Sequence, residues 1–463
     1  MLRPHRVLVA NRGEIAVRIV RACADEGVES VVAVSDADRD SMAALLADRT
    51  VCIGPGPSPH SYLDIDRVIA AALLTGCDAL HPGYGFLSER PELAEACAAN
   101  GIVFVGPDAS TIRRGGDKVA ARAVARSLGV PVGSGSEALS SVEQARQVAI
   151  SVGFPVLLKA AAGGGGRGMV LVEKPEDLDT RFASASREAE QAFGDGRVFI
   201  ERFVTRARHV EVQILADRHG GVIHLGERDC TAQRRYQKVV EEAPATVVPT
   251  AVRARLHEAA LELAHALDYV GAGTMEFIVD AESNDFSFLE VNTRVQVEHP
   301  VTELVTGVDI VREQLRLAAG EKLSVRQSDI HLTGHAVECR LNAEDPRRGF
   351  LPSPGVVRRW IPPQGGGVRV DSHLFGGYLV PPYYDSMLAK ILTHGDDRDH
   401  ALRRMDRALR RLVVDGVVTN REFLVDLIAH PDFVARRHHT RWVEERFLPA
   451  WAATDTSATL TTV

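Results

Sequence analysis

The sequence has no cysteine pair with the spacing of a metal site or a redox motif. Its six cysteines are scattered over 463 residues without any Cys-X-X-Cys pair. That spacing excludes a cysteine-based zinc site and predicts free thiols in a reducing cytosol. We interpret Cys230 and Cys339, which lie near motif residues, as packing residues, and we expect a cytoplasmic protein.

Long apolar runs and an excess of positive charge are also missing. No apolar run approaches the roughly 20 residues that span a bilayer, and residues 1–10 lack a signal-peptide pattern. The net charge is −8 and the isoelectric point is about 6.1, which argues against nucleic acid as the main partner. We therefore expect no membrane and no nucleic-acid contact. The length predicts roughly two to four domains.

Lysine is scarce, with six lysines among the 54 lysine and arginine residues. A chain that uses arginine almost everywhere keeps lysine by chance, or where a compact point charge is wanted. Three of the six, Lys118, Lys159 and Lys238, fall inside the motifs described below.

The first hundred residues alternate short apolar strands with amphipathic helices, which predicts a doubly wound α/β domain. Residues 6–10, 30–34, 79–80 and 102–105 are the expected strands, and residues 15–26 the first helix. The turn at residues 11–14 lacks the Gly-X-Gly-X-X-Gly pattern, so we reject a dinucleotide site there.

A glycine-rich loop marks the second unit. A predicted strand at residues 156–159 ends in Lys159 and leads to four consecutive glycines at 163–166. The loop lacks the Gly-Lys-Ser/Thr ending of a P-loop. A strand, a lysine and a glycine flap together predict a lid that closes over a triphosphate and excludes water. Further strands are expected at 198–204 and 209–215, and helices at 118–128, 399–412 and 421–429.

The most informative stretch is residues 288–303, where five polar side chains recur at every second position. An extended strand would place all five on one face. The alternative is an amphipathic edge strand with a solvated face. The five residues are Glu290, Asn292, Arg294, Gln296 and Glu298.

A hairpin brings a further acid to this stretch. Residues 272–279 and 286–291 read as antiparallel strands around a turn at 281–285, which sets Glu276 opposite Glu290. Like charges across a ladder repel, so we expect a cation between them. Two carboxylates and the amide of Asn292 suit magnesium or manganese bound with nucleotide phosphates. If the turn is miscounted by one residue, the two acids face apart.

Residues 227–242 are dense in cations and are bounded by strand-like segments. We interpret the run as a loop over the sheet that binds a small oxyanion and phosphates. A solvated charge run is the alternative.

These segments together resemble biotin carboxylase, an ATP-grasp enzyme that carboxylates the biotin of biotin-dependent carboxylases. The resemblance covers residues 3–445. It rests on residues 10–16, 81–89, 116–118, 159–169, 208–213, 227–242, 290–303, 335–345 and 381–387.

The resemblance implies an α/β and α+β fold in three domains. These are a doubly wound pre-ATP-grasp domain at 1–113, an ATP-grasp domain at 114–330 with a mobile lid at about 131–204, and a C-terminal biotin carboxylase domain at 331–446. We expect residues 447–463 to be disordered.

It also implies a role for each matching residue. ATP would be bound by Lys118, Lys159, Gly165, Gly166, Glu201, Arg202, Phe203, Val204, His209, Gln233, Tyr236, Glu276 and Glu290. Two Mg²⁺ ions, or Mg²⁺ and Mn²⁺, would be held by Glu276, Glu290 and Asn292. Bicarbonate would be bound by Lys238, Arg294, Gln296 and Val297. Lys238, Arg294, Glu298 and Arg340 would be the catalytic residues, with Glu298 as the base that deprotonates bicarbonate and Arg340 beside the biotin enolate.

The sequence departs from the family at a few positions. Tyr236 replaces the usual histidine near the nucleotide phosphates and carries no cation at neutral pH. Ala162 replaces a glycine of the lid. Arg21 matches a dimer-interface arginine, whereas Gly366 stands where some members have an interface phenylalanine. A homodimer is still expected.

The sequence lacks a Met-Lys-Met biotinylation motif and a carboxyltransferase domain. We therefore expect a biotin carboxyl carrier protein and a carboxyltransferase to be supplied in trans, as for the biotin carboxylase subunit of an acetyl-CoA or other acyl-CoA carboxylase. The final carboxyl acceptor is not determined by these residues. Two alternatives stay open: another ATP-grasp ligase of the carbamoyl phosphate synthetase type, and an inactive nucleotide-binding scaffold motivated by Tyr236.

Overall fold

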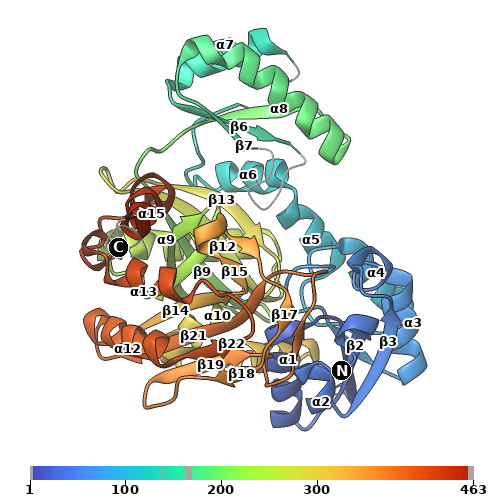
Figure 1. Cartoon of the computed structure of the whole chain (residues 1–463). Coiled ribbons are helices and arrows are strands. Elements are labelled where there is room, and N and C mark those ends of the chain that lie inside the picture. The colour runs from blue at the N-terminus through green and yellow to red at the C-terminus, as the bar shows by residue number, and fades with distance from the viewer. Residues whose placement is uncertain (1–3, 137, 140, 162–168, 457–463) are drawn as a thin grey trace, which may run out of the picture.

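The computed structural model describes residues 4–136, 138–139, 141–161 and 169–456. Three parts can be distinguished in Figure 1: an N-terminal α/β domain, a body built on a large sheet, and a small lobe, the lid, above the body. Within the described ranges no helix is long and apolar enough to cross a membrane.

The N-terminal domain is built on a five-stranded parallel sheet, as the alternation of strands and helices predicts. Val7, Leu8 and Val9 are fully buried, because a parallel sheet is covered on both faces. In spatial order the strands are β3 (Arg49–Gly54), β2 (Glu29–Ser35), β1 (Arg6–Val9), β4 (Ala79–His81) and β5 (Val103–Phe104). The helices are α1 (Gly13–Asp25), α2 (Met42–Leu46), α3 (Ile65–Thr75) and α4 (Pro91–Ala99).

The strand order reverses between β1 and β4, and ligand crevices of such sheets form at this point. The Asn11 side chain donates hydrogen bonds there to the carbonyls of Pro82 (2.7 Å) and Tyr84 (2.8 Å). The start of α1, with Glu14, is therefore held beside the loop at residues 82–89.

The body contains one eight-stranded antiparallel sheet, which is shared by the second and third units of the chain. Glu241 pairs with Glu338 where β11 meets β14, so the sheet crosses the expected boundary at residue 330 without interruption. In spatial order the strands are β13 (Phe286–Asn292), β12 (Gly271–Asp280), β9 (Ala207–Ala216), β10 (Val222–Arg234), β11 (Gln237–Ala243), β14 (His335–Asn342), β21 (Met387–Gly395) and β19 (Val368–Ser372).

Helices and small sheets complete the body. The helices are α5 (Ala109–Gly116), α6 (Lys118–Ser127), α9 (Thr250–Ala266), α10 (His299–Thr306), α11 (Ile310–Ala318), α12 (Arg398–Arg411), α13 (Arg421–Ala429) and α14 (Pro431–Val434). Three two-stranded sheets pair β15 (Glu344–Asp345) with β16 (Leu351–Pro352), β17 (Gly355–Val356) with β20 (Leu379–Val380), and β18 (Arg359–Ile361) with β22 (Val413–Asp415).

The charged run at residues 227–242 is not a loop, and this prediction is wrong. It forms most of β10 and β11, two central strands that a tight turn at Arg235 and Tyr236 joins, both with positive φ. Glu227, Arg228 and Glu241 are at most 1% exposed. Their charges are paired inside the protein instead of being solvated, and composition alone does not reveal this.

The predicted hairpin is confirmed, because β12 and β13 pair with Glu276 directly opposite Glu290. The extended strand expected through Glu298 is wrong beyond Asn292, where β13 ends. Residues 293–298 are irregular and lead into α10, so their side chains are placed by tertiary contacts instead of by strand alternation.

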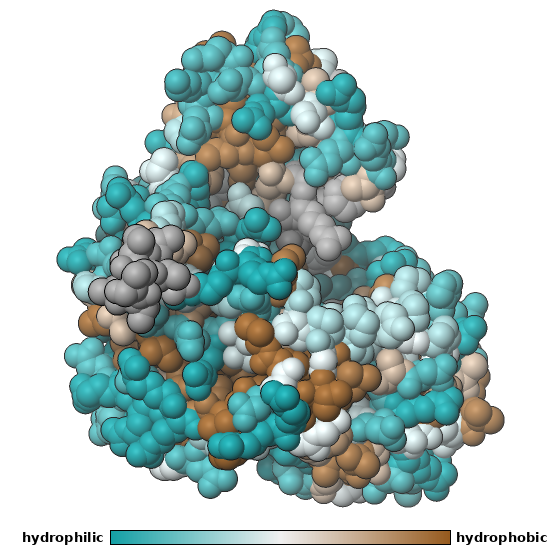
Figure 2. Space-filling model, viewed as in Figure 1, coloured by the Kyte–Doolittle hydropathy of each residue, from teal (hydrophilic) through white to brown (hydrophobic). Residues whose placement is uncertain are grey.

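The lid has a small core of its own. Its sheet has the order β7-β6-β8, and Ala145, Leu158 and Phe182 belong to its apolar cluster. Figure 2 shows an indentation between the lid and the N-terminal domain. The strands are β6 (Val156–Ala160), β7 (Met169–Val172) and β8 (Val198–Arg202), and the helices α7 (Val142–Val152) and α8 (Leu178–Phe193). The predicted phosphate loop, with Gly165 and Gly166, lies outside the described residues.

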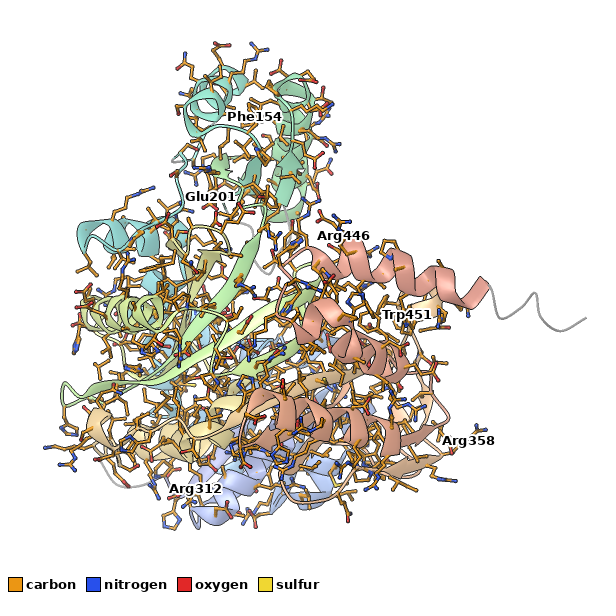
Figure 3. All side chains as sticks on the ribbon, turned by 90° about the vertical axis from the view of Figure 1, so that its left-hand side faces the viewer. Phe154, Glu201, Arg312, Arg358, Arg446 and Trp451 are labelled. Atoms are coloured by element: carbon orange, nitrogen blue, oxygen red, sulfur yellow. The ribbon has the colours of Figure 1, made fainter. Side chains whose placement is uncertain are left out.

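The C-terminal end is ordered further than expected. A π-helical turn at Val443–Phe447 continues into α15 (Leu448–Thr456), so the prediction of disorder from residue 447 is wrong as far as residue 456 (Figure 3). Trp451 packs edge-on against Phe423 and donates a hydrogen bond to Asp426 (2.7 Å). A single aromatic anchor in a Thr-, Ala- and Ser-rich segment explains the difference. Residues 457–463 lie outside the described residues.

Candidate active site

Lys238, on β11, is the centre of the candidate site. Its Nζ contacts the carboxylates of Glu211 (2.6 Å), Glu276 (3.1 Å) and Glu298 (2.5 Å), which come from β9, β12 and the turn before α10. Burial alone would lower the pKa of Lys238, but the three carboxylates outweigh burial and raise the pKa well above its ordinary value. Lys238 is therefore a permanent cation.

Glu298 lies between two cations. Its second oxygen accepts a hydrogen bond from Arg340 Nη2 (2.9 Å), and Arg340 also pairs with Glu241 (2.5 Å). Burial alone would raise the pKa of Glu298, but Lys238, Arg340 and Arg228 hold the pKa well below its ordinary value. The carboxylate is ionised at neutral pH and can accept a proton, as a general base must.

Arg228, on β10, connects several polar residues of the site through hydrogen bonds. Its guanidinium is fully buried, and it donates hydrogen bonds to Glu211 (2.6 Å) and Gln296 (2.7 Å). The remaining N–H groups reach Gln213, Thr274 and Thr302. Gln296 in turn donates to Glu276 (2.8 Å), so Arg228 orients one of the residues expected at bicarbonate.

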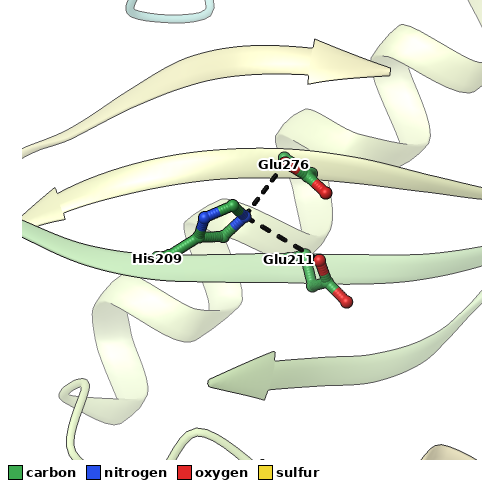
Figure 4. Close-up of side chains that lie close together, drawn as sticks. All are labelled: His209, Glu211 and Glu276. Atoms are coloured by element: carbon green, nitrogen blue, oxygen red, sulfur yellow. Dashed lines mark ion pairs between the residues drawn. The ribbon is translucent and has the colours of Figure 1, made fainter. Parts of the chain in front are cut away.

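The oxygen ligands expected for a metal lie together on the hairpin. Glu276 accepts hydrogen bonds from Asn292 (2.9 Å) and pairs with His209 (2.9 Å), as Figure 4 shows for the histidine. Glu290 lies directly across the ladder and pairs with Lys118 (2.8 Å). Burial alone would raise the pKa of Glu276, but Lys238 and His209 lower it well below its ordinary value. This set of two carboxylates and one amide fits Mg²⁺ bound together with phosphates.

Arg294 connects the site to the N-terminal domain. Its Nη2 donates to Asn292 (3.0 Å), and its Nε pairs with Glu89 (3.0 Å) from the loop after β4. The expected bicarbonate arginine is therefore neutralised by a carboxylate from another domain in this structure.

The residues expected at the nucleotide lie where the lid meets the body. Lys159 and Arg122 both pair with Glu201 at the end of β8, which Figure 3 labels. Arg202 ends the same strand, and Phe203 and Val204 follow it. The Phe203 ring lies 5.4 Å below the guanidinium of Arg441.

Two further residues of the expected nucleotide set lie on β10 and its turn. Gln233 donates to His209 Nδ1 (2.9 Å) beside Glu276. Tyr236 lies at the tip of the β10–β11 turn and is 47% exposed. Of the expected residues, Tyr236 is therefore peripheral to the Lys238 cluster, whereas Gln233 and His209 are connected to it.

Several residues of the site were not singled out from the sequence: Glu211, Arg228, Glu241 and Glu89. A signal for Glu211 existed, because His209, Glu211 and Gln213 alternate along β9 in the same way as residues 290–292 along β13. Arg228 and Glu241 lie in the charged run at residues 227–242, whose composition does not indicate that they are buried.

Comparisons with known proteins agree with this arrangement. Residues 3–112 match the family described as biotin carboxylase, N-terminal domain, and residues 338–445 match biotin carboxylase C-terminal domain. Residues 117–326 match the carbamoyl-phosphate synthase L chain, ATP binding domain. The biotin carboxylase of Pseudomonas aeruginosa is 51% identical over 443 residues, which cover 95% of this chain and 98% of the relative. The chain belongs to the biotin carboxylase family.

Solved structures of the family share the fold. The biotin carboxylase–β,γ-ATP complex from Campylobacter jejuni has a TM-score of 0.93 at 45% identity and covers 96% of this chain and 99% of that chain. The biotin carboxylase domain dimer of the Hydrogenobacter thermophilus 2-oxoglutarate carboxylase, with MgADP, ADP and bicarbonate, has a TM-score of 0.92 at 42% identity and covers 96% and 98%. The predicted family and its three-domain architecture are confirmed. The roles of single residues stay predictions.

Proposed function

We propose that this protein catalyses the ATP-dependent carboxylation of biotin by bicarbonate. The observation that carries the proposal is the buried cluster in which Lys238 and Arg340 clamp the ionised carboxylate of Glu298. The cluster occurs in a chain whose first and last domains both match biotin carboxylase. These two matches favour biotin carboxylation over a carbamoyl phosphate synthetase, to which only the middle domain corresponds by name.

The site supports a two-stage reaction. Bicarbonate, held by Lys238 and Arg294, gives its proton to Glu298 while its oxygen attacks the γ-phosphorus of ATP and the bond to ADP breaks. The product, carboxyphosphate, splits into CO2 and phosphate. The phosphate takes the ureido proton of biotin, and the freed nitrogen forms a bond to CO2 while Arg340 stabilises the negative ureido oxygen.

We infer nucleotide and metal binding from the same group of residues. Lys118, Lys159 and His209 would bind the ATP phosphates, with Glu276, Glu290 and Asn292 as the metal ligands. Bound Mg²⁺, or Mn²⁺ at a second position, would neutralise the developing phosphate charge. The lid would exclude the water that would otherwise hydrolyse carboxyphosphate.

We further propose a biotin carrier protein and a carboxyltransferase on separate chains, and a homodimer. Relatives that this chain matches over 98% of their own length are named biotin carboxylase. One structural relative is described as a domain dimer and another as the biotin carboxylase subunit of pyruvate carboxylase. The carboxyl acceptor is chosen by the transferase, so an acyl-CoA, pyruvate and 2-oxoglutarate all remain compatible with this site.

The test is ADP release by the purified protein with MgATP and bicarbonate, with and without free biotin. We expect biotin to stimulate ADP release, and Glu298→Gln to lower the stimulated rate by about 10²- to 10⁴-fold, the usual contribution of a general base. Glu188→Gln makes the same chemical change on the exposed face of α8 and serves as the control. ADP release that is independent of biotin, both free and carrier-bound, would refute the proposal.

A further inference from the structure

Lys390 is a fourth lysine at the site, although no motif or comparison assigns it a role. Of the six lysines, Lys174 and Lys322 are exposed, Lys118 pairs with Glu290 and Lys159 with Glu201 of the lid, and Lys238 is the centre of the candidate site. Lys390, on β21, is fully buried. It pairs across the ladder with Arg340, the arginine that contacts Glu298.

The ammonium group of Lys390 is aimed at the backbone of the expected base. Its Nζ donates a hydrogen bond to the carbonyl oxygen of Val297 (2.9 Å). This carbonyl belongs to the peptide bond whose nitrogen is that of Glu298. Residues 293–298 are irregular, with no ladder to hold them, so the lysine supplies a tie that secondary structure does not.

Lys390 is itself held from the N-terminal domain. Its Nζ pairs with Glu14 Oε1 (3.0 Å) at the start of α1, and Asp371 on β19 lies 3.9 Å away. Glu14 also accepts a hydrogen bond from the Tyr84 hydroxyl at the switch point of the parallel sheet. A chain of buried polar contacts therefore runs from the N-terminal domain through Glu14 and Lys390 to the Val297 carbonyl.

Stability alone does not explain a charge at this place. A buried ion pair is commonly no more stable than an apolar pair of similar size, because desolvation offsets the Coulomb attraction. Burial alone would lower the pKa of Lys390, but nearby carboxylates, Glu14 foremost and also Asp371, raise it, so the site keeps the lysine charged. An ammonium group has three N–H bonds, so Lys390 can bind the Glu14 carboxylate and the Val297 carbonyl at the same time.

We propose that Lys390 is a positioning residue for the bicarbonate base: it fixes the Val297–Glu298 peptide against the N-terminal domain through Glu14. The inference rests on the proposed function. In this role Lys390 touches neither bicarbonate nor biotin. It acts by holding the backbone that presents Glu298 to the substrate, so its loss affects bicarbonate more than ATP.

The test compares Lys390→Met with the parent in steady-state kinetics and nucleotide binding. We expect kcat/KM for bicarbonate to fall by about one to two orders of magnitude, the cost of misplacing a reacting group by about 1 Å. The dissociation constant for ATP should change less than about twofold, because no nucleotide contact is lost. The matched control is Ile391→Ala, the next residue on β21, which belongs to the apolar core of the C-terminal domain.

A second variant covers the case in which Lys390→Met folds poorly. Glu14→Gln combined with Lys390→Met removes the carboxylate that would be left unpaired, so it should restore folding without restoring the use of bicarbonate. Equal losses for bicarbonate and ATP in both variants, or a bicarbonate KM and kcat like those of Ile391→Ala, would overturn the inference. A parent protein without biotin-stimulated ADP release would instead overturn the proposed function.

Discussion

The two large sheets of this protein differ in whether their strands bury charged residues. The parallel sheet of the N-terminal domain buries apolar residues such as Val7, Leu8 and Val9, whereas the shared antiparallel sheet buries charged Glu211, Arg228 and Glu241 in addition to its apolar residues. An apolar strand gains stability from its own burial. A charged strand is tolerated only if each charge finds a partner, and each lost partner is then costly. The first sheet is a scaffold, and the second contains the candidate site.

Among the substitutions that test this difference between the sheets, Arg228→Met should cause the largest loss of stability. The substitution leaves Glu211 buried with Lys238 as its remaining close cation, so we expect a loss of about 3–5 kcal/mol in the free energy of unfolding. Biotin-stimulated ADP release should fall as well, since Gln296 loses its donor. Chemical denaturation and ADP release measure the two effects.

The control for Arg228→Met comes from the other sheet. Leu8→Ala on β1 should cost about 2–5 kcal/mol of stability through a cavity alone. Its kinetic constants should match the parent wherever the protein is folded. If Leu8→Ala impaired bicarbonate use as Arg228→Met does, the division between scaffold and site would fail.

Glu338→Gln should have a smaller, pH-dependent effect. Among the described residues, neither carboxylate oxygen of Glu338 has a hydrogen-bond partner, and burial raises its pKa well above its ordinary value. The folded protein therefore holds this proton more tightly than the unfolded chain. The parent loses stability as pH rises from about 4.3, the ordinary value for glutamate, through the raised pKa.

Glutamine does not titrate, so the variant escapes this loss. We expect Glu338→Gln to equal the parent near pH 4.5 and to exceed its stability at pH 8 by about 1–3 kcal/mol, the cost of an unsatisfied buried group. Denaturant midpoints at several pH values measure this, with Glu188→Gln on α8 as the exposed counterpart. A difference that shrinks toward pH 8 would contradict the expectation.

Tyr236→His should have the smallest effect, because the residue lies at an exposed turn outside the buried network. Tyr236 adopts a φ of 63°, a region that histidine populates more readily than bulky aromatics. A partly charged imidazole near the phosphates should lower the KM for ATP by no more than about fivefold, as for an exposed ion pair. Kinetics with ATP as the varied substrate measure it, and an inactive parent rescued by histidine would favour the scaffold hypothesis.

Local patterns were sufficient for part of the fold and of the site. Apolar runs and turn residues predicted the parallel sheet, the helix at 421–429 and the β12–β13 hairpin with Glu276 opposite Glu290. Each of these depends on residues that are neighbours in the chain or a few positions apart, and their periodicity is visible in the sequence. The family resemblance likewise followed from short segments of the sequence.

Tertiary structure alone decided which charges are buried and what pairs with them. Arg228 pairs with Glu211, Lys238 with Glu298, and Lys390 with Val297, partners that lie 17 to 93 positions apart in the chain. A charged residue has the same local signature whether water or a distant carboxylate solvates it. The sequence by itself therefore determined many of the strands and the kinds of side chain available for chemistry. Only the tertiary structure determined where the charged groups meet, because inside the protein partners distant in the chain take the place of water around each charge.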